Sequence, residues 1–479
     1  MTALRKTKIV CTLGPATEDD AILRAMIQAG MNVARLNFSH GTYEGHAQNI
    51  RRIRALSAEL HTPVGIMLDT KGPEIRLKTF RDHRVTLQKG QLFTLCTGDV
   101  EGDAEHVSIT YADLPADVQP GTTILIDDGL VGLTVEAVSK TEIQCRVNNG
   151  GVISDRKGIN VPDANLSMPF ISRKDREDIL FGIREDVDFI AASFTRTEED
   201  ILAIRKLLTD NGGKGISIIA KIENMQGVQN IDSILAVSDG VMVARGDLGV
   251  EIPLEQIPII QKMIIRKAYS RGKQIITATQ MLDSMIKNPR PTRAEATDVA
   301  NAIYDGTGAI MLSGETAAGL YPVEAVRTMA RIAQVAEASI DYVQRFRDSV
   351  PRPSANITNA ISHACCTSAQ DLNATAIVTV TKTGFTAKML SRFRPGCPII
   401  ACAPVERVVR QLCLSWGITP LLIEEVTDTD ELFERAVDAG IDAGLLHKDD
   451  LIVMTAGVPL GISGTTNLMR VHVVGSHQW

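Results

Sequence analysis

Two acidic residues and a lysine lie at the ends of two consecutive apolar runs in the middle of the chain. Lys221 and Glu223 close the run ISIIAKIE (216–223), and Asp247 closes the next run, GVMVARGD (240–247). Because side chains two residues apart in a strand point to the same face, Lys221 and Glu223 are expected side by side. Two carboxylates can hold a divalent cation such as Mg²⁺, and an ammonium beside that cation can stabilise a phosphoryl group during transfer.

Taken alone, a lysine and a glutamate at a strand end are more often a structural ion pair than part of a catalytic site. The other apolar runs change this balance, because buried charge is costly unless it is paired or binds a ligand. Polar residues close most of these runs: Arg35, Asn37, Ser39, Asp69, Thr70, Lys221, Glu223, Asp247, Thr279, Ser313 and Glu315.

The runs alternate with longer amphipathic stretches, which is the pattern of repeated strand–helix units. There are eight runs, at residues 7–14, 32–38, 64–70, 188–194, 216–223, 240–247, 274–280 and 308–315. Helices are expected between them, for example over 42–60, 196–210 and 255–271. Eight such units predict an α/β protein with a (β/α)8 TIM barrel, whose polar strand ends meet at one face.

Two further regions interrupt or follow this pattern. Residues 72–170 are short, alternating segments punctuated by Gly, Asp and Asn, which predict a small β-barrel inserted as a lid. The barrel would then comprise 1–71 and 171–345. After a Pro-containing linker, PRPSANITNA (351–360), strands are expected at 374–380, 397–402 and 450–457. Residues 346–479 are therefore predicted to form a C-terminal open α/β domain with a regulatory role.

Composition excludes several classes of protein. A chain of 479 residues exceeds what one core usually holds, and its net charge of −7 disfavours general nucleic-acid binding. Eight cysteines without a CxxC pair are typical of reduced thiols in a cytoplasmic protein. We see no signal peptide and no apolar stretch that could span a bilayer, so no membrane association is expected. Neither a P-loop, a dinucleotide GxGxxG motif nor an HExxH zinc motif occurs.

Blocks along essentially the whole chain, in order, resemble those of the pyruvate kinase family, with a bacterial character. IIAKIENMQGV (218–228) closely resembles the active-site signature of that family. The other matching blocks are TKIVCTLGPA (7–16), MNVARLNFSHG (31–41), LDTKGPEIR (68–76), ARGDLGVE (244–251), TATQML (277–282), PTRAEATDVANAI (291–303) and MLSGETAAGLYP (311–322). The resemblance implies phosphoryl transfer from phosphoenolpyruvate to ADP, giving pyruvate and ATP in the last step of glycolysis.

The resemblance also implies roles for the residues at the strand ends. Lys221 resembles the lysine that stabilises the transferring phosphoryl group, and Arg35 the arginine that contacts the phosphate of phosphoenolpyruvate. Glu223 and Asp247 resemble the protein ligands of the divalent metal, Mg²⁺ or Mn²⁺.

Three further positions match the part of the family's site that binds and protonates the substrate. Gly246, Asp247 and Thr279 resemble the site of the substrate carboxylate. Thr279 also matches the threonine near the carbon that is protonated, within a water relay to which Ser313 is assigned as well.

Asn37, Ser39, Asp69 and Thr70 match the monovalent-cation site of the family. Their hydroxyl, amide, carboxylate and carbonyl oxygens suit a hard cation. Glu74 stands where K⁺-dependent members carry Glu and independent members carry Lys, so the resemblance implies activation by K⁺. Without the surrounding motif, Glu74 would be interpreted as a solvated loop residue.

Nucleotide contacts are implied in the lid and beside it. Arg76 and Lys157 resemble residues that contact the nucleotide phosphates. Asn37 is also expected to be part of the nucleotide-binding site. A lid that carries a cation over a metal-bound phosphate would exclude water and complete the site on closing.

The segment VTKTGFTAKMLSRFRPGCPII (380–400) predicts a strand, a hydroxyl-rich turn and a helix. Backbone N–H groups and hydroxyls of such a turn suit an anion, although ordinary N-capping by Thr is the commoner explanation of the pattern. In the family this turn is the effector-phosphate loop. The expected contacts of a sugar phosphate are Thr381, Lys382, Thr383, Gly384 and Thr386.

The identity of this effector stays open, and assembly is implied only by the family. Animal members that bind fructose 1,6-bisphosphate have later Trp and Arg contacts that TDELFER (429–435) and AGVPLGISGTTN (456–467) do not supply. A monophosphate sugar or AMP therefore remains possible in its place. A homotetramer is implied by the family alone.

Two other functions would leave different features in the sequence. A metal-dependent aldolase or lyase would share the two carboxylates but would need no nucleotide lid. A regulatory binding protein that had lost its chemistry would lack Lys221, Glu223 or Asp247, and all three are present.

Overall fold

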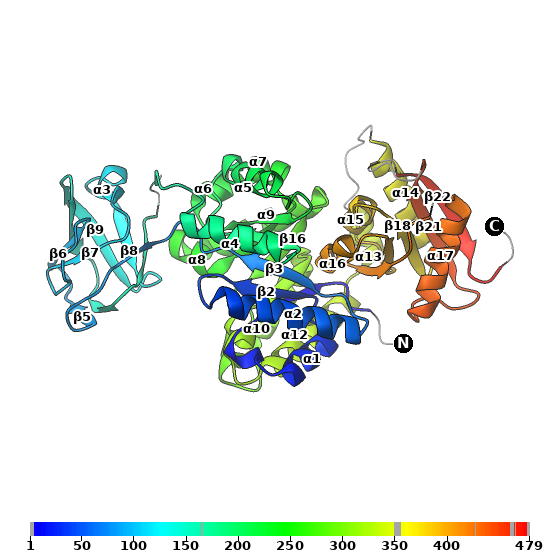
Figure 1. Ribbon diagram of the computed structural model, residues 1–479, viewed down its shortest axis with the longest axis horizontal. Helices are drawn as coiled ribbons and strands as arrows, with labels where there is room; N and C mark the ends of the chain where they lie inside the picture. Colours follow the sequence, from blue (N-terminus) through cyan, green and yellow to red (C-terminus); the bar gives the residue numbers. More distant parts are fainter. Residues whose placement is uncertain are drawn as a thin grey trace.

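The computed structural model describes residues 4–162, 164, 166–348, 356–426, 428–459, 464 and 466–476. Three parts follow one another along the long axis of the molecule: a small β lid, a central barrel and a C-terminal α/β part (Figure 1). Within the described ranges, no helix is both long and apolar enough to cross a membrane.

The central part is a closed barrel of eight parallel strands, as the eight apolar runs predict. Around the barrel the order is β1-β17-β16-β15-β14-β13-β3-β2. The strands are β1 (Lys8–Thr12), β2 (Val33–Asn37), β3 (Gly65–Asp69), β13 (Phe189–Ala192), β14 (Ser217–Ile222), β15 (Gly240–Ala244), β16 (Gln274–Ala278) and β17 (Ala309–Leu312). Nearly every residue in them is buried, because helices cover the outside and side chains fill the inside.

The longer helices of the barrel bury one apolar stripe each against these strands. They are α1 (Asp20–Ala29), α2 (Tyr43–Glu59), α4 (Arg173–Arg184), α5 (Glu198–Asp210), α9 (Ile257–Ser270), α10 (Arg293–Asp305) and α12 (Pro322–Ala338). Local sequence sets where several of them begin. Thr292 and Glu295, for example, form a capping box that satisfies the first free N–H groups of α10. The three helices predicted at 42–60, 196–210 and 255–271 correspond to α2, α5 and α9 within two residues at each end.

Shorter helices follow the strand ends and bring loop residues toward the barrel mouth. They are α6 (Met225–Gln229), α7 (Ile231–Val237), α8 (Arg245–Glu251) and α11 (Gly314–Ala317). The ends of two predicted strands were wrong here. The run 308–315 stops as strand β17 at Leu312, and Glu315 lies in the first turn of α11. The run 240–247 was expected to be extended to its end, but β15 stops at Ala244 and Asp247 lies in the first turn of α8.

The lid is a curled sheet in the order β4-β12-β8-β9-β10-β6-β7, with a small β11-β5 sheet beside it. Its strands are β4 (Ile75–Arg76), β5 (Arg84–Leu87), β6 (Leu92–Cys96), β7 (His106–Ser108), β8 (Thr123–Ile126), β9 (Val131–Val138), β10 (Glu142–Val147), β11 (Gly151–Ser154) and β12 (Gly158–Asn160), with the one-turn helix α3 (Leu114–Asp117). A bridge between Leu77 and Ile109 joins the two outer strands, so the sheet curls around one apolar cluster.

The C-terminal part is an open sheet in the order β20-β19-β18-β21-β22. Its elements are α13 (Tyr342–Asp348), α14 (Ile357–Asp371), β18 (Ala376–Val380), α15 (Phe385–Arg392), β19 (Ile399–Ala403), α16 (Glu406–Leu412), β20 (Ile418–Leu422), α17 (Thr429–Asp442), β21 (Leu451–Gly457) and β22 (Thr466–Val473). The linker predicted at 351–360 was wrong in its last residues, because α14 begins at Ile357; residues 351–355 lie outside the described ranges.

The C-terminal part packs against the bottom of the barrel, opposite the strand ends that carry the polar residues. Helices α13, α15 and α16 face the barrel in Figure 1. Leu414, which follows α16, is fully buried in the cluster of side chains that fills the barrel interior. Arg410 of α16 pairs with Asp188, just before β13, at 2.7 Å. The two parts therefore share both apolar and charged contacts.

Candidate active site

The Lys221 ammonium group is the centre of a buried polar cluster at the barrel mouth. Its Nζ lies 2.9 Å from Oε1 of Glu223, 3.0 Å from Oδ1 of Asp69 and 2.7 Å from Oγ of Ser193. Burial alone would lower the pKa of Lys221, but the charges of Asp69 and Glu223 outweigh burial and raise it above its ordinary value. The side chain is therefore a charged ammonium, and it lies beside Glu223, as the spacing of positions 221 and 223 predicts.

Arg35 adds a second cation to the cluster. Its Nε lies 2.6 Å from Oδ2 of Asp69, and its Nη1 donates to Oγ1 of Thr12 at 2.9 Å. Burial acts to raise the pKa of Asp69, yet the charges of Arg35 and Lys221 together hold it below its ordinary value. The ionised carboxylate of Asp69, at the end of β3, thus holds both Arg35 and Lys221 in position.

Glu223 is a carboxylate in an environment that disfavours its charge. It is almost completely buried, and Oε2 accepts a hydrogen bond from the backbone N–H of Phe194 at 2.6 Å. Burial is the main cause that raises the pKa of Glu223 to about 7, with Lys221 acting against it and the nearby charge of Asp247 adding to the rise. Asp247 therefore lies close enough to Glu223 for the two negative charges to repel.

This donor set fits a divalent cation. Two carboxylates that repel each other in a buried site are stabilised in their ionised form by a metal ion between them. In the described part of the chain, no group of three or more His, Cys, Asp or Glu side chains forms a denser metal site. A site with only two protein carboxylates is typical of Mg²⁺, which keeps waters and substrate oxygens as its other ligands.

The four residues predicted for a monovalent cation are neighbours at one corner of the mouth. Asn37 and Asp69 face each other at the ends of β2 and β3. The backbone N–H of Ser39 donates to Oδ1 of Asn37 at 3.1 Å, and Oγ1 of Thr70 accepts from the backbone N–H of Ser193 at 3.2 Å. Asp69 uses one oxygen for Arg35 and the other for Lys221 and Ser193, which leaves lone-pair capacity for a cation.

Thr279 follows β16 in a left-handed backbone conformation, with φ of +68°. Such a conformation is costly for a Thr and is found mainly where function requires it. Its Oγ1 accepts a hydrogen bond from the backbone N–H of Gly246 at 2.8 Å, so the two predicted carboxylate contacts are adjacent. Arg245 holds the carbonyl oxygen of Thr279 at 2.7 Å.

Ser313 lies beyond β17 and is tied to the same region through Glu315. The carboxylate of Glu315 accepts hydrogen bonds from the backbone N–H groups of Ser313 and Leu282, at 2.7 and 3.0 Å. The buried Oγ of Ser313 has no hydrogen-bond partner within the described structure. A buried hydroxyl of this kind can hydrogen-bond to a water molecule or to a ligand atom.

The lid brings its own charges toward the barrel mouth. Arg76 pairs with Glu74 at 2.7 Å, and Lys157 pairs with Asp127 at 2.9 Å. The lid turn lies close to α8 of the barrel, since a Cβ on Gly129 would lie 3.7 Å from Cγ1 of Val250. Burial, followed by the charge of Asp247, raises the pKa of Asp128 in this turn. Glu74 is therefore an ion-paired residue rather than a solvated one.

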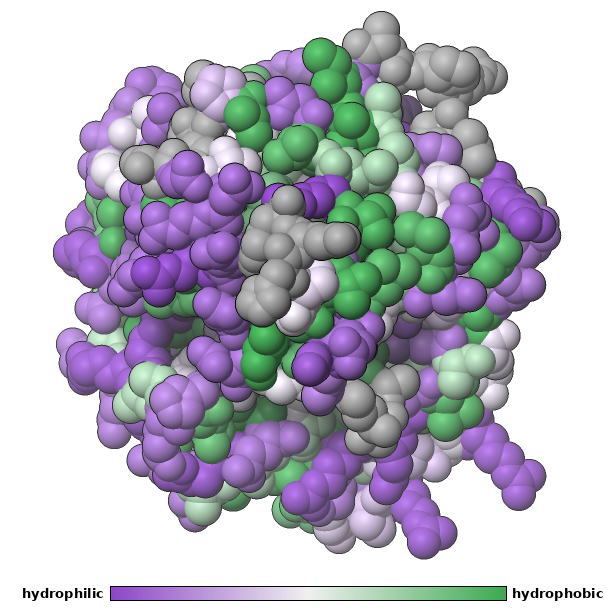
Figure 2. Space-filling model, turned by 90° about the vertical axis from the view of Figure 1, so that its right-hand side faces the viewer, coloured by the Kyte–Doolittle hydropathy of each residue, from purple (hydrophilic) through white to green (hydrophobic). Residues whose placement is uncertain are grey.

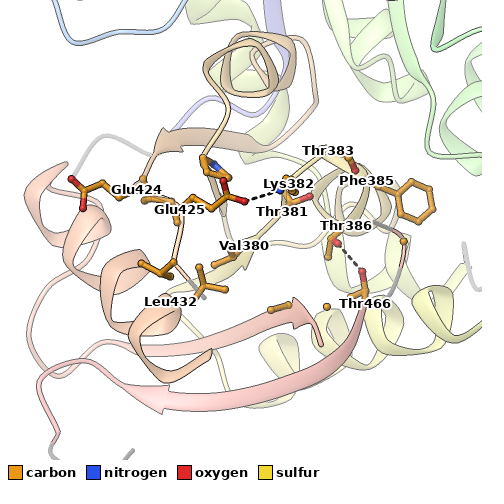
Figure 3. A pocket seen from close by; sticks show the side chains of 16 residues that line it. Val380, Thr381, Lys382, Thr383, Phe385, Thr386, Glu424, Glu425, Leu432 and Thr466 are labelled. Carbon is orange, nitrogen blue, oxygen red and sulfur yellow. Dashed lines mark hydrogen bonds and ion pairs between the residues drawn. The ribbon is translucent and has the colours of Figure 1, made fainter. Parts of the chain in front are cut away.

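A second candidate site lies in the C-terminal part, around the turn between β18 and α15 (Figure 3). The predicted effector residues Thr381, Lys382, Thr383 and Thr386 line a cavity there, and Gly384 has the positive φ of +78° that the turn requires. Lys382 points to Glu425 and pairs with it at 2.6 Å, whereas Glu424 points away (Figure 3). Oγ1 of Thr386 contacts Oγ1 of Thr466 at 2.6 Å.

Sequence reasoning missed two residues of the barrel site. Ser193 bonds to Lys221, Asp69 and the carbonyl oxygen of Thr70, and Arg245 positions Thr279 while pairing with Asp298. Ser193 does close an apolar run, which is the signal that identified the other residues, but it carries no charge. Arg245 lies between two predicted site positions, Glu223 and Gly246, but it was not itself predicted to belong to the site.

A (β/α)8 barrel with a lid and a centre of two cations and paired carboxylates at its mouth defines a class of barrel phosphotransferases. Comparison with known proteins narrows this class. The family model described as "Pyruvate kinase, barrel domain" matches residues 4–326, and "Pyruvate kinase, alpha/beta domain" matches residues 359–472.

Individual relatives agree with these models. A pyruvate kinase of Clostridium acetobutylicum is 53% identical over 472 residues, which cover 98% of this chain and 100% of the relative. One of Staphylococcus haemolyticus is 52% identical over 474 residues, covering 98% and 81%. The crystal structure of a pyruvate kinase from Cryptosporidium parvum superposes with a TM-score of 0.93, at 42% identity, over 98% and 96% of the chains. The chain belongs to the pyruvate kinase family and is a phosphoryl-transferring kinase.

Proposed function

We propose that the protein transfers the phosphoryl group of phosphoenolpyruvate to ADP, giving pyruvate and ATP. The observation that carries this proposal is the meeting of Lys221, Arg35, Glu223 and Asp247 at one barrel mouth. Membership of the pyruvate kinase family gives the substrates.

Charge stabilisation is the main contribution of the chain to this reaction. A terminal oxygen of ADP attacks the phosphorus in line, and negative charge spreads over the equatorial oxygens of the transferring group. Lys221 and Arg35, both fixed by Asp69, hold that charge without reorganising. No general base is required for ADP, because phosphoryl transfer depends mainly on positioning and charge.

Glu223 and Asp247 would hold Mg²⁺ or Mn²⁺, in keeping with the metal dependence of the family. The bound ion would neutralise phosphate oxygens and orient the substrate. Asn37, Ser39, Asp69 and Thr70 would hold K⁺ beside it, and Glu74, which is paired with Arg76, stands at the position that is Glu in the K⁺-dependent members of the family.

The product side of the reaction needs a proton at the methylene carbon of enolpyruvate. Gly246, Asp247 and Thr279 would bind the carboxylate of the substrate and so orient that carbon. Thr279 would supply the proton through a water relay. The hydroxyl of Ser313, which has no partner among the described residues, would be a second member of that relay.

The lid would bind the nucleotide and exclude water. We assign residues 72–170 to this lid, 1–71 and 171–345 to the catalytic barrel and 346–479 to a regulatory part. Arg76 and Lys157 would contact the phosphates of ADP, with Asn37 at the barrel edge. Asn160 of β12 donates to Glu251 of α8 at 2.8 Å, a contact that supports closing of the lid onto the barrel.

Activation by a sugar monophosphate or AMP at the β18–α15 turn is the proposed regulation. The hydroxyls of Thr381, Thr383 and Thr386 and the ammonium of Lys382 suit a phosphate group, and the cavity beside them has room for its carrier. Two carboxylates, Glu424 and Glu425, also line the cavity. They disfavour a bisphosphate, because the negative charges of its second phosphate would need cationic partners.

Assembly into a homotetramer is proposed from the family, with support from the outer face of the C-terminal part. Strand β22 is an edge strand, and Val471 and Val473 on it are 44% and 38% exposed. Ile357, at the start of α14, is 69% exposed. Apolar side chains also gather on this end of the molecule in Figure 2, as expected of a subunit contact.

A coupled assay tests the proposed reaction. With phosphoenolpyruvate, ADP, Mg²⁺ and K⁺ present, one ATP should form for each pyruvate, and omission of ADP should stop the reaction. Pyruvate release that is independent of ADP would contradict kinase activity and favour a lyase. Repeating the assay with sugar monophosphates, fructose 1,6-bisphosphate and AMP would identify the effector.

A further inference from the structure

Four cations surround a small cavity at the bottom of the barrel, far from the polar strand ends. Lys273 belongs to the turn between α9 and β16, whereas Lys388 and Arg392 lie on α15 and Arg394 follows it. The turn and the helix approach each other closely: a Cβ on Gly272 would lie 3.2 Å from Sδ of Met389. The cavity is therefore a built interface between barrel and C-terminal part.

Arg394 is the most constrained of the four. Its side chain is buried, and its guanidinium lies 4.4 Å from the ring centre of Trp416 and 5.6 Å from that of Tyr269. Its Nη2 donates to the carbonyl oxygen of Gly306 at 2.8 Å. Nε and Nη1 are buried without a hydrogen-bond partner in the described structure. Buried donors of a charged group are rarely left unpaired, because the desolvation cost is large.

The carboxylates near the cluster are bonded to other groups: Glu337, whose charge acts on Arg394, accepts the backbone N–H groups of Lys6 and Thr7. Among the described residues, no carboxylate forms an ion pair with Lys273, Lys388, Arg392 or Arg394. The charge of Asp239 acts on both lysines, but that carboxylate is paired with Arg205. Burial lowers the pKa of all four cations, that of Arg394 to about 9.

We propose that this cavity binds a phosphate group, free or as the end of a small phosphate monoester, between the barrel and the C-terminal part. Nε and Nη1 of the planar Arg394 guanidinium are donors of the kind that bind the oxygens of a tetrahedral anion, and Lys273 and Lys388 line the same cavity. This site is separate from the proposed effector loop, which lies at the opposite end of α15.

The size of the cavity restricts the ligand. Its accessible volume is about 20 Å³, which is room for about one water molecule. A phosphate group could therefore place one oxygen against Arg394 while its other oxygens meet Lys388 and Arg392, which are only partly buried. A bulky carrier would have to remain outside.

Trp416 gives a direct readout, because its ring stacks on Arg394. The chain has two Trp residues, and the other, Trp479, lies outside the described ranges. In full-length W479F protein, titration with sodium phosphate at an ionic strength held constant with NaCl should change Trp416 emission to saturation. R394Q in the same background should abolish the change, and K388Q should raise the phosphate concentration at half-saturation several-fold.

Matched variants separate this site from the others. K382Q, in the effector loop, and K206Q, on the exposed face of α5, should leave the phosphate titration unchanged. A parallel titration with glycerol phosphate shows whether the anion is preferred free or as a monoester, since the better ligand saturates at lower concentration. The proposal would be overturned if chloride gave an equal response, or if phosphate gave no saturable response at all. It would also be overturned if K388Q left the half-saturation concentration of phosphate unchanged. The K388Q variant keeps the proposal testable if R394Q does not fold.

Discussion

The carboxylate of Asp69 accepts a hydrogen bond from Nζ of Lys221 at 3.0 Å, and its second oxygen accepts one from Nε of Arg35 at 2.6 Å. A residue expected only to bind a monovalent cation is thus also the anchor of both proposed catalytic cations. This arrangement resembles a preorganised site, in which the charges that face the transition state are held in place before substrate arrives.

Asp69→Asn should therefore impair catalysis more than loss of a K⁺ ligand alone would. An amide cannot balance two cations, so Lys221 and Arg35 would shift, and misplacement of this kind costs about 10²-fold in rate. Steady-state kinetics at saturating K⁺ would measure the loss. If excess K⁺ restored the wild-type kcat, Asp69 would act only through the monovalent cation and the anchoring role would be wrong.

Lys221→Met tests the transition-state contact itself. Removal of one charged donor should lower kcat by about 10²–10³-fold, while Arg35 and Ser193 still satisfy Asp69 and the fold persists. Rapid-quench or steady-state kinetics would give kcat, and Mn²⁺ binding would check that Glu223 and Asp247 remain competent. Lys206→Met, on the exposed face of α5, is the matched control. Near-normal turnover in Lys221→Met would refute the assigned role.

The monovalent-cation site predicts a dependence on ion size. Replacing K⁺ by Na⁺ at equal ionic strength should lower activity by more than about tenfold, which corresponds to about 1.4 kcal/mol in the barrier. Glu74→Lys should reduce the difference between the two ions, because a fixed ammonium would replace part of the bound charge. Equal rates in K⁺ and Na⁺ for the unchanged protein would remove the site from the mechanism.

Much of this arrangement was predictable because barrel strands obey a simple rule. Apolar runs that end in Arg35, Asp69 or Lys221 have few explanations other than a shared site at the barrel mouth. Position along the chain does not reveal how those groups pair, however. Ser193 and Asp69 became visible as partners of Lys221 only once β3, β13 and β14 lay side by side.

The C-terminal sheet shows where patterns along the chain were too weak. Strand β20 contains Pro420, which is tolerated because β20 is an edge strand but which argues against a strand in the sequence. Strand β22 mixes polar and apolar residues, and its apolar Val471 and Val473 are partly exposed, so it forms no continuous apolar run in the sequence. Both were absent from the prediction, although the fold class was confirmed.

The ion pair between Lys382 and Glu425 predicts a competition at the effector loop. A phosphate group must take Lys382 from Glu425, so Glu425→Gln should lower the effector concentration for half-maximal activation. Partly exposed pairs of this kind are weak, and an effect of about two- to fivefold is expected. Glu424→Gln is the matched control, since Glu424 points away from Lys382 (Figure 3). A larger effect in the Glu424 variant would contradict the assigned pairing.

The contact between barrel and C-terminal part should depend on pH through Asp186. Burial acts to raise the pKa of this carboxyl, but hydrogen bonds and charge from Arg407 and Arg410 of α16 hold it below its ordinary value of 3.8. A carboxyl whose pKa is lowered on folding stabilises the protein above its unfolded value, and that stability is lost as pH falls through the folded value. Asp186→Asn should therefore lower stability at neutral pH, by about 0.2–1 kcal/mol because Asp186 is half exposed.

Thermal scans of both proteins from pH 8 downward would check the sign. The difference in unfolding temperature should stay constant to about pH 5, which lies above the ordinary pKa of an Asp, and then narrow below pH 3.8. Glu406→Gln is the control, because Glu406 is 75% exposed and lies 3.5 Å from Arg410. A difference that widened in acid would mean that Asp186 is paired in the unfolded chain or unpaired in the folded one. The contact between α16 and the barrel would then rest on other groups, such as Asp188, Gln411 and Leu414.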